Sequence, residues 1–377
     1  MRPDRSQFRD AHRYLAAVAS EVVRPALRAY ARSRSRGAPT PPAEWRRGVI
    51  LGATHIGDVL YRTCSLAQLH DGLPECRWTY VATSVGAELL AGNPALSDVL
   101  VMGDGDPTRA QQLAQAEFDV ALCTDNIQHH TGLGTAVRAG IPNRVAFGSK
   151  GLTGLATVAV PVHRASWPEQ FAQMVRAVTN RPASWPLRPR VYLTESDTRE
   201  AAAVFDALPQ ADAPHTIAAA VTTRQRLGVF PPSLFAEILR RAVAIEPSLR
   251  IVLTGSADDR AALEALATVV GDRAAVTAGA QKVRATVALL TRCDAFLGSD
   301  SGPRHMANAA GIPAFFVRNM AVPEIEAGRY CDSEVDLAPP GQYLSAAANV
   351  AALDRIDASA AAAELVEAAR RHRATAR

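Results

Sequence analysis

The chain has few cysteines and no long apolar run. Its five cysteines, in 377 residues, show no Cys-x-x-Cys spacing, which argues against a zinc site and against a disulfide framework. No apolar stretch approaches the roughly 18 residues that a bilayer-spanning helix needs. The first residues include Arg and Asp and lack the apolar core of a signal peptide. We therefore expect a cytoplasmic protein with reduced, mostly buried thiols.

Lysine is also nearly absent, because Lys150 and Lys282 are the only two. Arginine, which carries the remaining basic charge, favours bidentate contacts to phosphate, although genome composition can produce the same bias. The first 47 residues hold eleven arginines and four acidic residues, a net charge of +7, so the rest of the chain carries −3. The body of the protein is therefore not a basic nucleic-acid binder.

The basic N-terminal segment has the pattern of an amphipathic helix over residues 8–32. Arg24, Arg28 and Arg32 follow one another at i, i+4 spacing, and residues 33–42 are rich in Arg, Ser, Gly and Pro, as in a linker. Such a helix can rest on an anionic membrane or pack on its own domain. Both alternatives stay open, the first being peripheral contact at the inner membrane through residues 8–36.

Strand-like runs alternate with helix-compatible stretches over most of the chain. The first series is predicted at 48–52, 78–82, 98–102, 118–123 and 144–147, and the second at 216–221, 250–255, 274–277, 294–298 and 314–317. This rhythm predicts an α/β fold with parallel, doubly wound sheets. We divide the chain into a helical extension over 1–46, an N-terminal domain over 47–195, a C-terminal domain over 196–345 and a terminal helix over 346–377.

The segment from Gly298 to Met306, GSDSGPRHM, is the most informative stretch. It lies between an apolar run and a small-residue run, which indicates a strand, a tight loop and a helix. Pro303 suits the first helical turn. Unpaired N–H groups and the helix dipole make such a terminus a binding site for an anion such as phosphate. The alternative is a turn that Asp300 or Ser301 simply caps.

A second strand–loop–helix pattern begins at Gly48 and places Gly57 and Asp58 at a helix start. Gly57-Asp58 with the following VLYRTCSLAQL, the distal GSDSGPRHMANAAGIP, and LLAGNPALSDVLVM over residues 89–102 together resemble glycosyltransferase family 9, the heptosyltransferase family. The resemblance covers roughly residues 47–330. It implies a GT-B architecture, in which two Rossmann-like domains face a central cleft and bind ligands at the carboxyl ends of their strands.

The family resemblance implies the transfer of a sugar from an ADP-linked donor, with heptose as the first candidate sugar. It also implies that the transfer inverts the anomeric configuration and needs neither a metal nor a cofactor. Such a transfer needs a base for the acceptor hydroxyl and positive character for the leaving diphosphate. The resemblance assigns the base role to Asp58, for which a helix N-cap is the alternative. We place Gly57 and His55 on the acceptor side.

The resemblance also implies a donor site in the C-terminal domain. Asp300, Ser301 and Gly302 would meet the diphosphate through backbone amides, and His305 would contact phosphate, ribose or only the loop. Thr222, Thr223, and Arg224 or Arg226 follow the first strand of this domain, where the family usually has a lysine one position closer. Each arginine can neutralise phosphate or lie on the surface.

Gly255 and Ser256 end another strand of the C-terminal domain, on the expected nucleoside side. The alternative there is an ordinary βα turn in which Ser256 or Asp258 caps the next helix. Asp104-Gly105-Asp106 looks like a metal-binding DxD motif but lies among turn residues, and His129-His130 reads as a loop, so we predict no metal.

Two rival functions are weighed against the transferase. A dinucleotide-dependent oxidoreductase is disfavoured because the first loop lacks the G-x-G-x-x-G spacing. A degenerate family member would bind a sugar nucleotide or a partner without catalysis. The acceptor also stays open between a glycan, a lipid-linked molecule, a small molecule and a protein, because the sequence after Asp58 departs from the lipopolysaccharide enzymes.

Overall fold

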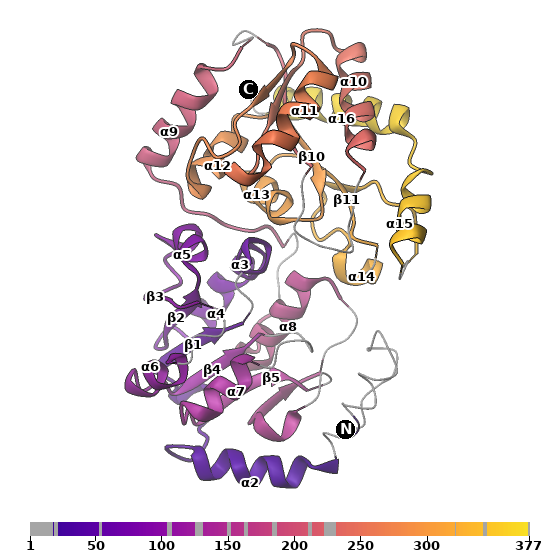
Figure 1. Ribbon diagram of the computed structural model, residues 1–377. Coiled ribbons are helices and arrows are strands. Elements are labelled where there is room, and N and C mark those ends of the chain that lie inside the picture. Colours follow the sequence, from indigo (N-terminus) through magenta and orange to yellow (C-terminus); the bar gives the residue numbers. More distant parts are fainter. Residues whose placement is uncertain are drawn as a thin grey trace. The chain divides into compact units, whose positions relative to one another are not determined.

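The computed structural model describes residues 18, 22–52, 55–103, 108–124, 131–148, 152–161, 165–182, 187–209, 213–221, 231–320, 322–341 and 345–375. The chain divides into two compact units, Met1–Leu187 and Arg188–Arg377. Each unit has its own six-stranded parallel sheet (Figure 1).

The first unit is built on a sheet with the strand order β3-β2-β1-β4-β5-β6. Its strands are β1 (Arg47–Leu51), β2 (Arg77–Ala82), β3 (Asp98–Val101), β4 (Val120–Cys123), β5 (Asn143–Phe147) and β6 (Val158–Val160). Every residue of β4 and β5 is buried, as expected for central parallel strands that are covered on both faces.

Helices cover this sheet. They are α2 (Arg24–Arg34), η2 (Pro42–Glu44), α3 (Ile56–Thr63), α4 (Leu66–Gly72), α5 (Ser84–Leu90), α6 (Arg109–Gln115), α7 (Thr131–Arg138), η4 (Thr153–Leu155) and α8 (Trp167–Thr179). Leu113 of α6 and Val137 of α7 share one core cluster with Val49 of β1. These helices therefore pack on the same face of the sheet.

Helix α2 is the described part of the predicted basic helix. Its Ala31 is 2% exposed and belongs to the core of the first unit, with Leu27 packed against the same cluster. Tyr30, Arg28 and Arg32 are exposed on the same helix. The part of the N-terminal segment described by the structure thus packs on its own domain through one face and leaves a basic face outside.

The second unit repeats this topology, with the strand order β12-β11-β10-β7-β8-β9. Its strands are β7 (Thr216–Ala220), β8 (Arg250–Leu253), β9 (Ala274–Val276), β10 (Ala295–Ser299), β11 (Ala314–Val317) and β12 (Glu334–Asp336). In both units the first three strands of the chain are added toward one edge of the sheet, and the next three toward the other edge. The strand order therefore reverses between β1 and β4 in the first unit and between β7 and β10 in the second. Ligands of doubly wound sheets bind at the carboxyl ends of the strands at this point.

The helices of the second unit are α9 (Glu195–Asp206), α10 (Pro232–Ile245), η5 (Ala257–Asp259), α11 (Arg260–Val270), α12 (Val283–Leu290), α13 (Gly302–Ala310), α14 (Glu324–Ala327), α15 (Ala346–Leu353) and α16 (Ala358–Thr375). Phe235 of α10, Leu263 of α11 and Leu365 of α16 are buried in one cluster with Ile217 of β7. The C-terminal helix therefore completes the core of this unit.

The predicted fold class, two Rossmann-like α/β domains, is confirmed. All ten predicted strands are present, with ends shifted by at most a few residues. Two further strands, β6 and β12, were not predicted. Each has three residues and lies at one end of its sheet, so neither carries a long apolar run.

Candidate functional site

The loop after β1 brings Asp58 to the carboxyl end of the first sheet. Gly52 directly follows this strand and packs against Thr124. A Cβ atom at Gly52 would lie 2.0 Å from Thr124 Oγ1, so glycine permits this approach. Helix α3 begins at Ile56 with His55 as its N-cap residue, and Asp58 lies in its first turn beside Gly57. Asp58 is therefore not the helix N-cap, which was the alternative to a chemical role.

The Asp58 carboxylate accepts two contacts from its own helix. The Tyr61 hydroxyl donates to Oδ1 at 2.8 Å, and His55 Nδ1 lies 3.2 Å from Oδ2. The Asp58 side chain is 24% exposed, whereas that of His55 is 85% exposed. Asp58 thus has a fixed orientation and remains accessible to solvent.

Electrostatics keep Asp58 ionised. Burial alone would raise the pKa of the Asp58 carboxyl. The hydrogen bond from His55 and the charge of Arg62 outweigh burial and hold that pKa below its ordinary value. Burial raises the pKa of Tyr61 well above its ordinary value, so its hydroxyl keeps the proton that it donates. The result is an oriented carboxylate that can accept a proton.

The buried Arg62 holds the start of α3, where Asp58 lies. Its side chain is 2% exposed, donates from Nη1 to the Asp58 carbonyl at 2.8 Å, and lies 3.9 Å from the Asp58 carboxylate. Nη2 donates to the Thr124 carbonyl at 3.3 Å, which ties the start of α3 to the end of β4. Arg62 therefore joins the start of α3 to the end of β4 at the switch point of the first sheet.

In the second unit, the loop Asp300–Ser301 connects β10 to α13 at the corresponding switch point. Ser301 is the N-cap residue, Gly302 is the first residue of α13, and Pro303 is in its first turn, as predicted. Within the part of the chain that the structure describes, no side-chain hydrogen bond from Ser301 caps the helix; its hydroxyl instead contacts Ser299. The first turn thus has the features of an anion site rather than of a side-chain-capped turn.

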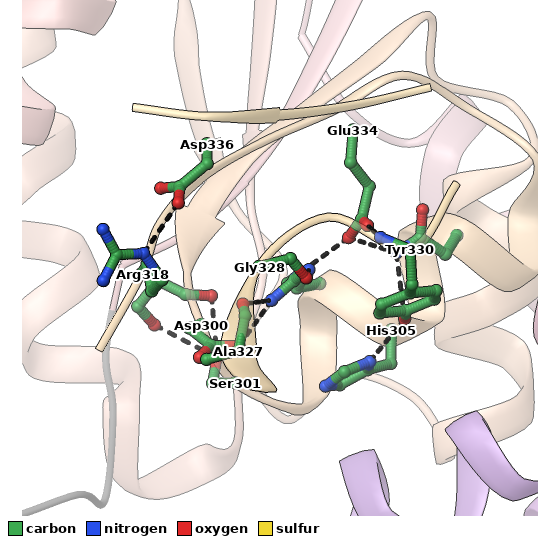
Figure 2. A network of polar contacts seen from close by, with 12 residues as sticks. Asp300, Ser301, His305, Arg318, Ala327, Gly328, Tyr330, Glu334 and Asp336 are labelled. Atoms are coloured by element: carbon green, nitrogen blue, oxygen red, sulfur yellow. Dashed lines mark hydrogen bonds and ion pairs between the residues drawn. The ribbon is translucent and has the colours of Figure 1, made fainter. Parts of the chain in front are cut away.

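The Asp300 carboxylate is held by a buried arginine. Arg304, which is 1% exposed, donates from Nη1 to Asp300 Oδ1 at 2.8 Å and from Nε to Glu334 Oε1 at 2.6 Å (Figure 2). It also donates to the carbonyls of Ala327 and Gly328. Asp300 therefore fixes the loop. Its own backbone N–H donates to the Val317 carbonyl at 3.0 Å, so the predicted contact of the Asp300 amide with a diphosphate would compete with this hydrogen bond.

Glu334 stays ionised inside the protein. Burial would raise its pKa, but the charge of Arg304 and the hydrogen bonds from Arg304 and Tyr330 hold that pKa below its ordinary value. The neighbouring carboxylates raise the pKa of Arg304 despite its burial. A buried pair of this kind is costly to break, because removing one partner leaves the other charge unpaired.

His305 follows Arg304 in the first turns of α13 and is 8% exposed. Its Nδ1 lies 2.6 Å from the hydroxyl of Tyr330, whose ring is stacked beside the imidazole. Asn308 Nδ2 contacts both Tyr330 Oη at 3.1 Å and Glu334 Oε1 at 2.7 Å. His305 is therefore connected through Tyr330 and Asn308 to Glu334, the partner of Arg304 (Figure 2).

Ser256 has a local partner. It forms a capping box with Asp259, donating from both its backbone N–H and its hydroxyl to Oδ2 of that residue. The amide of Gly279 donates to the carbonyl of Gly255 at 3.0 Å. The geometry is that of the capped βα turn, and a nucleoside contact from the Ser256 hydroxyl would compete with Asp259.

Several predicted residues lie outside the described residues. They are Thr222, Thr223, Arg224 and Arg226 of the donor-side loop, Asp104 to Asp106 of the DxD-like turn, and His129 and His130. Among the residues that are described, no group of three or more His, Cys, Asp or Glu side chains could hold a metal ion. No helix in the same described ranges is long and apolar enough to cross a membrane.

Sequence reasoning missed the residues that hold the two loops. These are Tyr61, Arg62, Arg304, Asn308, Tyr330 and Glu334. The available signal was an arginine four residues after each loop aspartate, at Arg62 and Arg304, which is the spacing of neighbours on one helix face. Tyr330 and Glu334 gave no comparable signal.

Comparison with known proteins identifies the family. The model of glycosyltransferase family 9 (heptosyltransferase) matches residues 109–315. No curated protein sequence matches the chain significantly.

Solved structures share the fold. The glycosyltransferase family 9 protein from Veillonella parvula is 15% identical, with 89% of this chain and 99% of that chain covered and a TM-score of 0.70. E. coli ADP-heptose LPS heptosyltransferase II is 18% identical, with 86% of this chain and 99% of that chain covered and a TM-score of 0.68. E. coli heptosyltransferase WaaC with ADP-2-deoxy-2-fluoro heptose is 15% identical, with 80% and 97% covered and a TM-score of 0.58.

The predicted GT-B fold class is thus confirmed by structures that match almost along their whole length. The family model extends from α6 of the first unit to β11 of the second and spans more than half of the chain. The chain therefore belongs to glycosyltransferase family 9, the heptosyltransferase family, and is a glycosyltransferase.

Proposed function

We propose that this glycosyltransferase moves heptose from ADP-heptose to an acceptor hydroxyl with inversion at the anomeric carbon and without a metal or cofactor. The observation that carries the proposal is the Asp58 carboxylate, oriented by Tyr61 and His55 at the carboxyl end of β1. The family supports the transferase chemistry, and the ADP-linked ligands named for heptosyltransferase II and WaaC support the donor.

In the proposed reaction, Asp58 takes the proton of the acceptor hydroxyl as its oxygen forms a bond to the anomeric carbon. The bond from that carbon to the diphosphate oxygen breaks, and its electron pair leaves with ADP. Attack from the face opposite the leaving group inverts the configuration. General base catalysis of this kind contributes about 10²- to 10⁴-fold to the rate.

The leaving diphosphate would be stabilised by the second unit. Backbone amides at Ser301 and Gly302, the positive end of the α13 dipole and His305 are the proposed contacts, with an arginine of the pair Arg224 and Arg226. Asp300 would act through the loop that it fixes to Arg304. Gly255 and Ser256 are proposed on the nucleoside side, and Gly57 and His55 on the acceptor side.

The test is a binding screen with ADP, UDP, GDP and CMP, followed by turnover of ADP-heptose in the presence of a chelator. Selective ADP binding by both the wild type and Asp58→Asn, with turnover lost only in Asp58→Asn, is expected. The anomeric configuration of the product, read by NMR, checks inversion. Another preferred nucleotide would overturn the donor, and donor binding without turnover in any acceptor mixture would favour a degenerate binding protein.

The acceptor is proposed to be a glycan, a lipid-linked glycan or a small molecule, reached with help from a peripheral membrane contact at the N-terminal segment. The support is the segment at α2. Arg28, Arg32 and Tyr30 of this helix are exposed, as are Val22 and Val23 just before it. Co-sedimentation with anionic vesicles should fall in Arg28→Glu/Arg32→Glu and not in the matched pair Arg199→Glu/Arg371→Glu. Equal sedimentation of both pairs would remove this idea.

A further inference from the structure

The buried cluster beside α13 determines which atom of Asn308 faces which neighbour. Glu334 Oε1 accepts from Arg304 Nε at 2.6 Å and also lies 2.7 Å from the side-chain amide of Asn308. An ionised carboxylate can only accept hydrogen bonds, so the amide nitrogen of Asn308 must face it. Cys331 Sγ, whose pKa is raised by burial, donates to Asn308 Oδ1 at 3.1 Å. Both contacts give the same orientation of the amide.

This orientation passes to Tyr330. Asn308 Nδ2 carries two hydrogens, and its second contact is the Tyr330 hydroxyl at 3.1 Å. The Tyr330 oxygen therefore accepts from Asn308. The same hydroxyl lies 2.6 Å from His305 Nδ1, a contact in which either group can be the donor. When the hydroxyl donates, Nδ1 accepts and carries no proton, and the proton of a neutral His305 is then on Nε2.

We propose that Glu334, Asn308 and Tyr330 form a hydrogen-bond relay that holds His305 as the neutral Nε2–H tautomer, so that His305 donates to an oxygen of the donor diphosphate. This proposal rests on the proposed function for its ligand. Glu334, Asn308 and Tyr330 are positioning residues, because they act through His305 and are themselves buried, at 0%, 0% and 2% exposure.

The position of the ring supports a ligand contact. His305 lies one turn into α13, beside a first turn in which Ser301 makes no side-chain cap within the described part of the chain. In Figure 2 the His305 ring lies at the margin of the cluster and contacts Tyr330 through Nδ1. The positive end of the helix dipole disfavours a proton on both nitrogens and favours an anion nearby. A neutral N–H donor is therefore the form of histidine that suits this place.

The first measurement is the tautomer of His305, because the proposed relay acts by fixing it. Long-range ¹⁵N–¹H spectra of ¹⁵N-histidine-labelled full-length protein distinguish Nδ1–H, Nε2–H and doubly protonated rings. The His305 signals, among nine histidines, are those that disappear in His305→Gln. We expect Nε2–H in the wild type and a mixture of tautomers in Tyr330→Phe, with the other histidine signals unchanged as a check on folding. An Nδ1–H or doubly protonated His305 in the wild type would overturn the relay.

Affinity for ADP, measured by calorimetry, is the second readout. Loss of a well-oriented hydrogen bond to an anion should weaken ADP binding about 10-fold in Tyr330→Phe. Glutamine can place an amide N–H near the position of Nε2. In a His305→Gln background the Tyr330→Phe change should therefore weaken ADP binding by less than about twofold. Tyr192→Phe, which changes a half-buried tyrosine of the same unit outside the cluster, should bind as the wild type does.

The two readouts separate this proposal from the proposed function. Additive effects of Tyr330→Phe and His305→Gln on affinity would mean that Tyr330 does not act through His305, which overturns the relay even if ADP binds. If the wild type has the Nε2–H tautomer but binds neither ADP nor inorganic pyrophosphate, the diphosphate contact fails. If pyrophosphate binds and ADP does not, the relay and its contact stand, and the ADP donor is wrong.

Discussion

At the scale of single residues, the two loop aspartates have the same local pattern but different surroundings. Each is followed four positions later by a buried arginine, Arg62 after Asp58 and Arg304 after Asp300. The Arg62 guanidinium is 3.9 Å from its carboxylate, whereas that of Arg304 is 2.8 Å away and also pairs with Glu334. The Asp58 carboxylate thus remains available for proton transfer, whereas the Asp300 carboxylate is held in an ion pair that fixes its loop.

A first prediction concerns Tyr61→Phe. A base works only when deprotonated, so activity is lost on the acid side as Asp58 takes up a proton. The Tyr61 hydroxyl helps to hold the pKa of Asp58 below its ordinary value, so its removal raises that pKa. We expect the acid limb of the kcat/KM profile to move to higher pH, and kcat at pH 7 to fall about 3- to 10-fold. An acid limb that stays in place while Tyr30→Phe behaves like wild type would contradict a base role for Asp58.

A second prediction concerns the buried ion pair. Arg304→Met leaves Glu334 unpaired at 0% exposure and should reduce the free energy of unfolding by about 3–5 kcal/mol at pH 7. Because the pKa of Glu334 is depressed in the folded protein, the stability it contributes is present above its unfolded pKa, about 4.3, and is lost as pH falls through the folded value. Urea unfolding should therefore show the deficit shrinking at acid pH.

The exposed Arg371→Met change, which removes a surface pair with Glu367, is the matched control for Arg304→Met. It should alter the free energy of unfolding by less than about 1 kcal/mol at either pH. A deficit for Arg304→Met that is equally small, or independent of pH, would mean that the Glu334 charge is compensated by other groups.

The site could be predicted from the sequence only where its residues are contiguous. The Gly57-Asp58 pair and the Asp300–His305 loop each form one short motif between a strand and a helix. The partner of Arg304 lies 30 positions later, on the three-residue strand β12, where no periodicity marks a buried carboxylate. Predicting it would require the register of β11 and β12, which is set by packing and not by any local pattern.

At the scale of elements, the fold followed from hydrophobic pattern. Central strands such as β10 and β11 are buried along their whole length, so they read as continuous apolar runs. The edge strand β6 has one exposed and one partly buried residue among its three, and such a short segment has no recognisable alternation. The other two edge strands, β3 and β9, were predicted, so an edge position alone does not hide a strand.

A third prediction concerns the attachment of α2. A Cβ atom at Gly154 of η4 would lie 2.6 Å from Leu27 Cβ and 2.7 Å from the Arg24 carbonyl oxygen, so Gly154→Ala must displace α2. We expect a loss of about 1–3 kcal/mol in the free energy of unfolding and faster hydrogen exchange of the α2 amides. Gly37→Ala has nothing within 4 Å of the added atom and should change neither quantity. Unchanged hydrogen exchange of the α2 amides in Gly154→Ala would mean that contacts other than the one at Gly154 attach α2 to the domain.

At the scale of the whole molecule, the two units share one topology but differ in what lies at the switch point. The first places an oriented carboxylate there, with Arg62 bridging the ends of α3 and β4. The second places a helix N-terminus without a side-chain cap from Ser301 among its described residues, held by a buried charge cluster. A proton acceptor and an anion site are the two functions that the proposed transfer divides between acceptor and donor.

A fourth prediction follows from this division. ADP at 100 times its dissociation constant should raise the free energy of opening of the structure that binds it by about 2.7 kcal/mol. Hydrogen exchange with and without ADP should therefore slow in the unit Arg188–Arg377, most of all from β10 through the first turns of α13. Asp58→Asn should show the same protection, because its carboxylate belongs to the first unit. Protection confined to Met1–Leu187 would place the nucleotide in the wrong unit and would require the donor and acceptor roles of the two sheets to be exchanged.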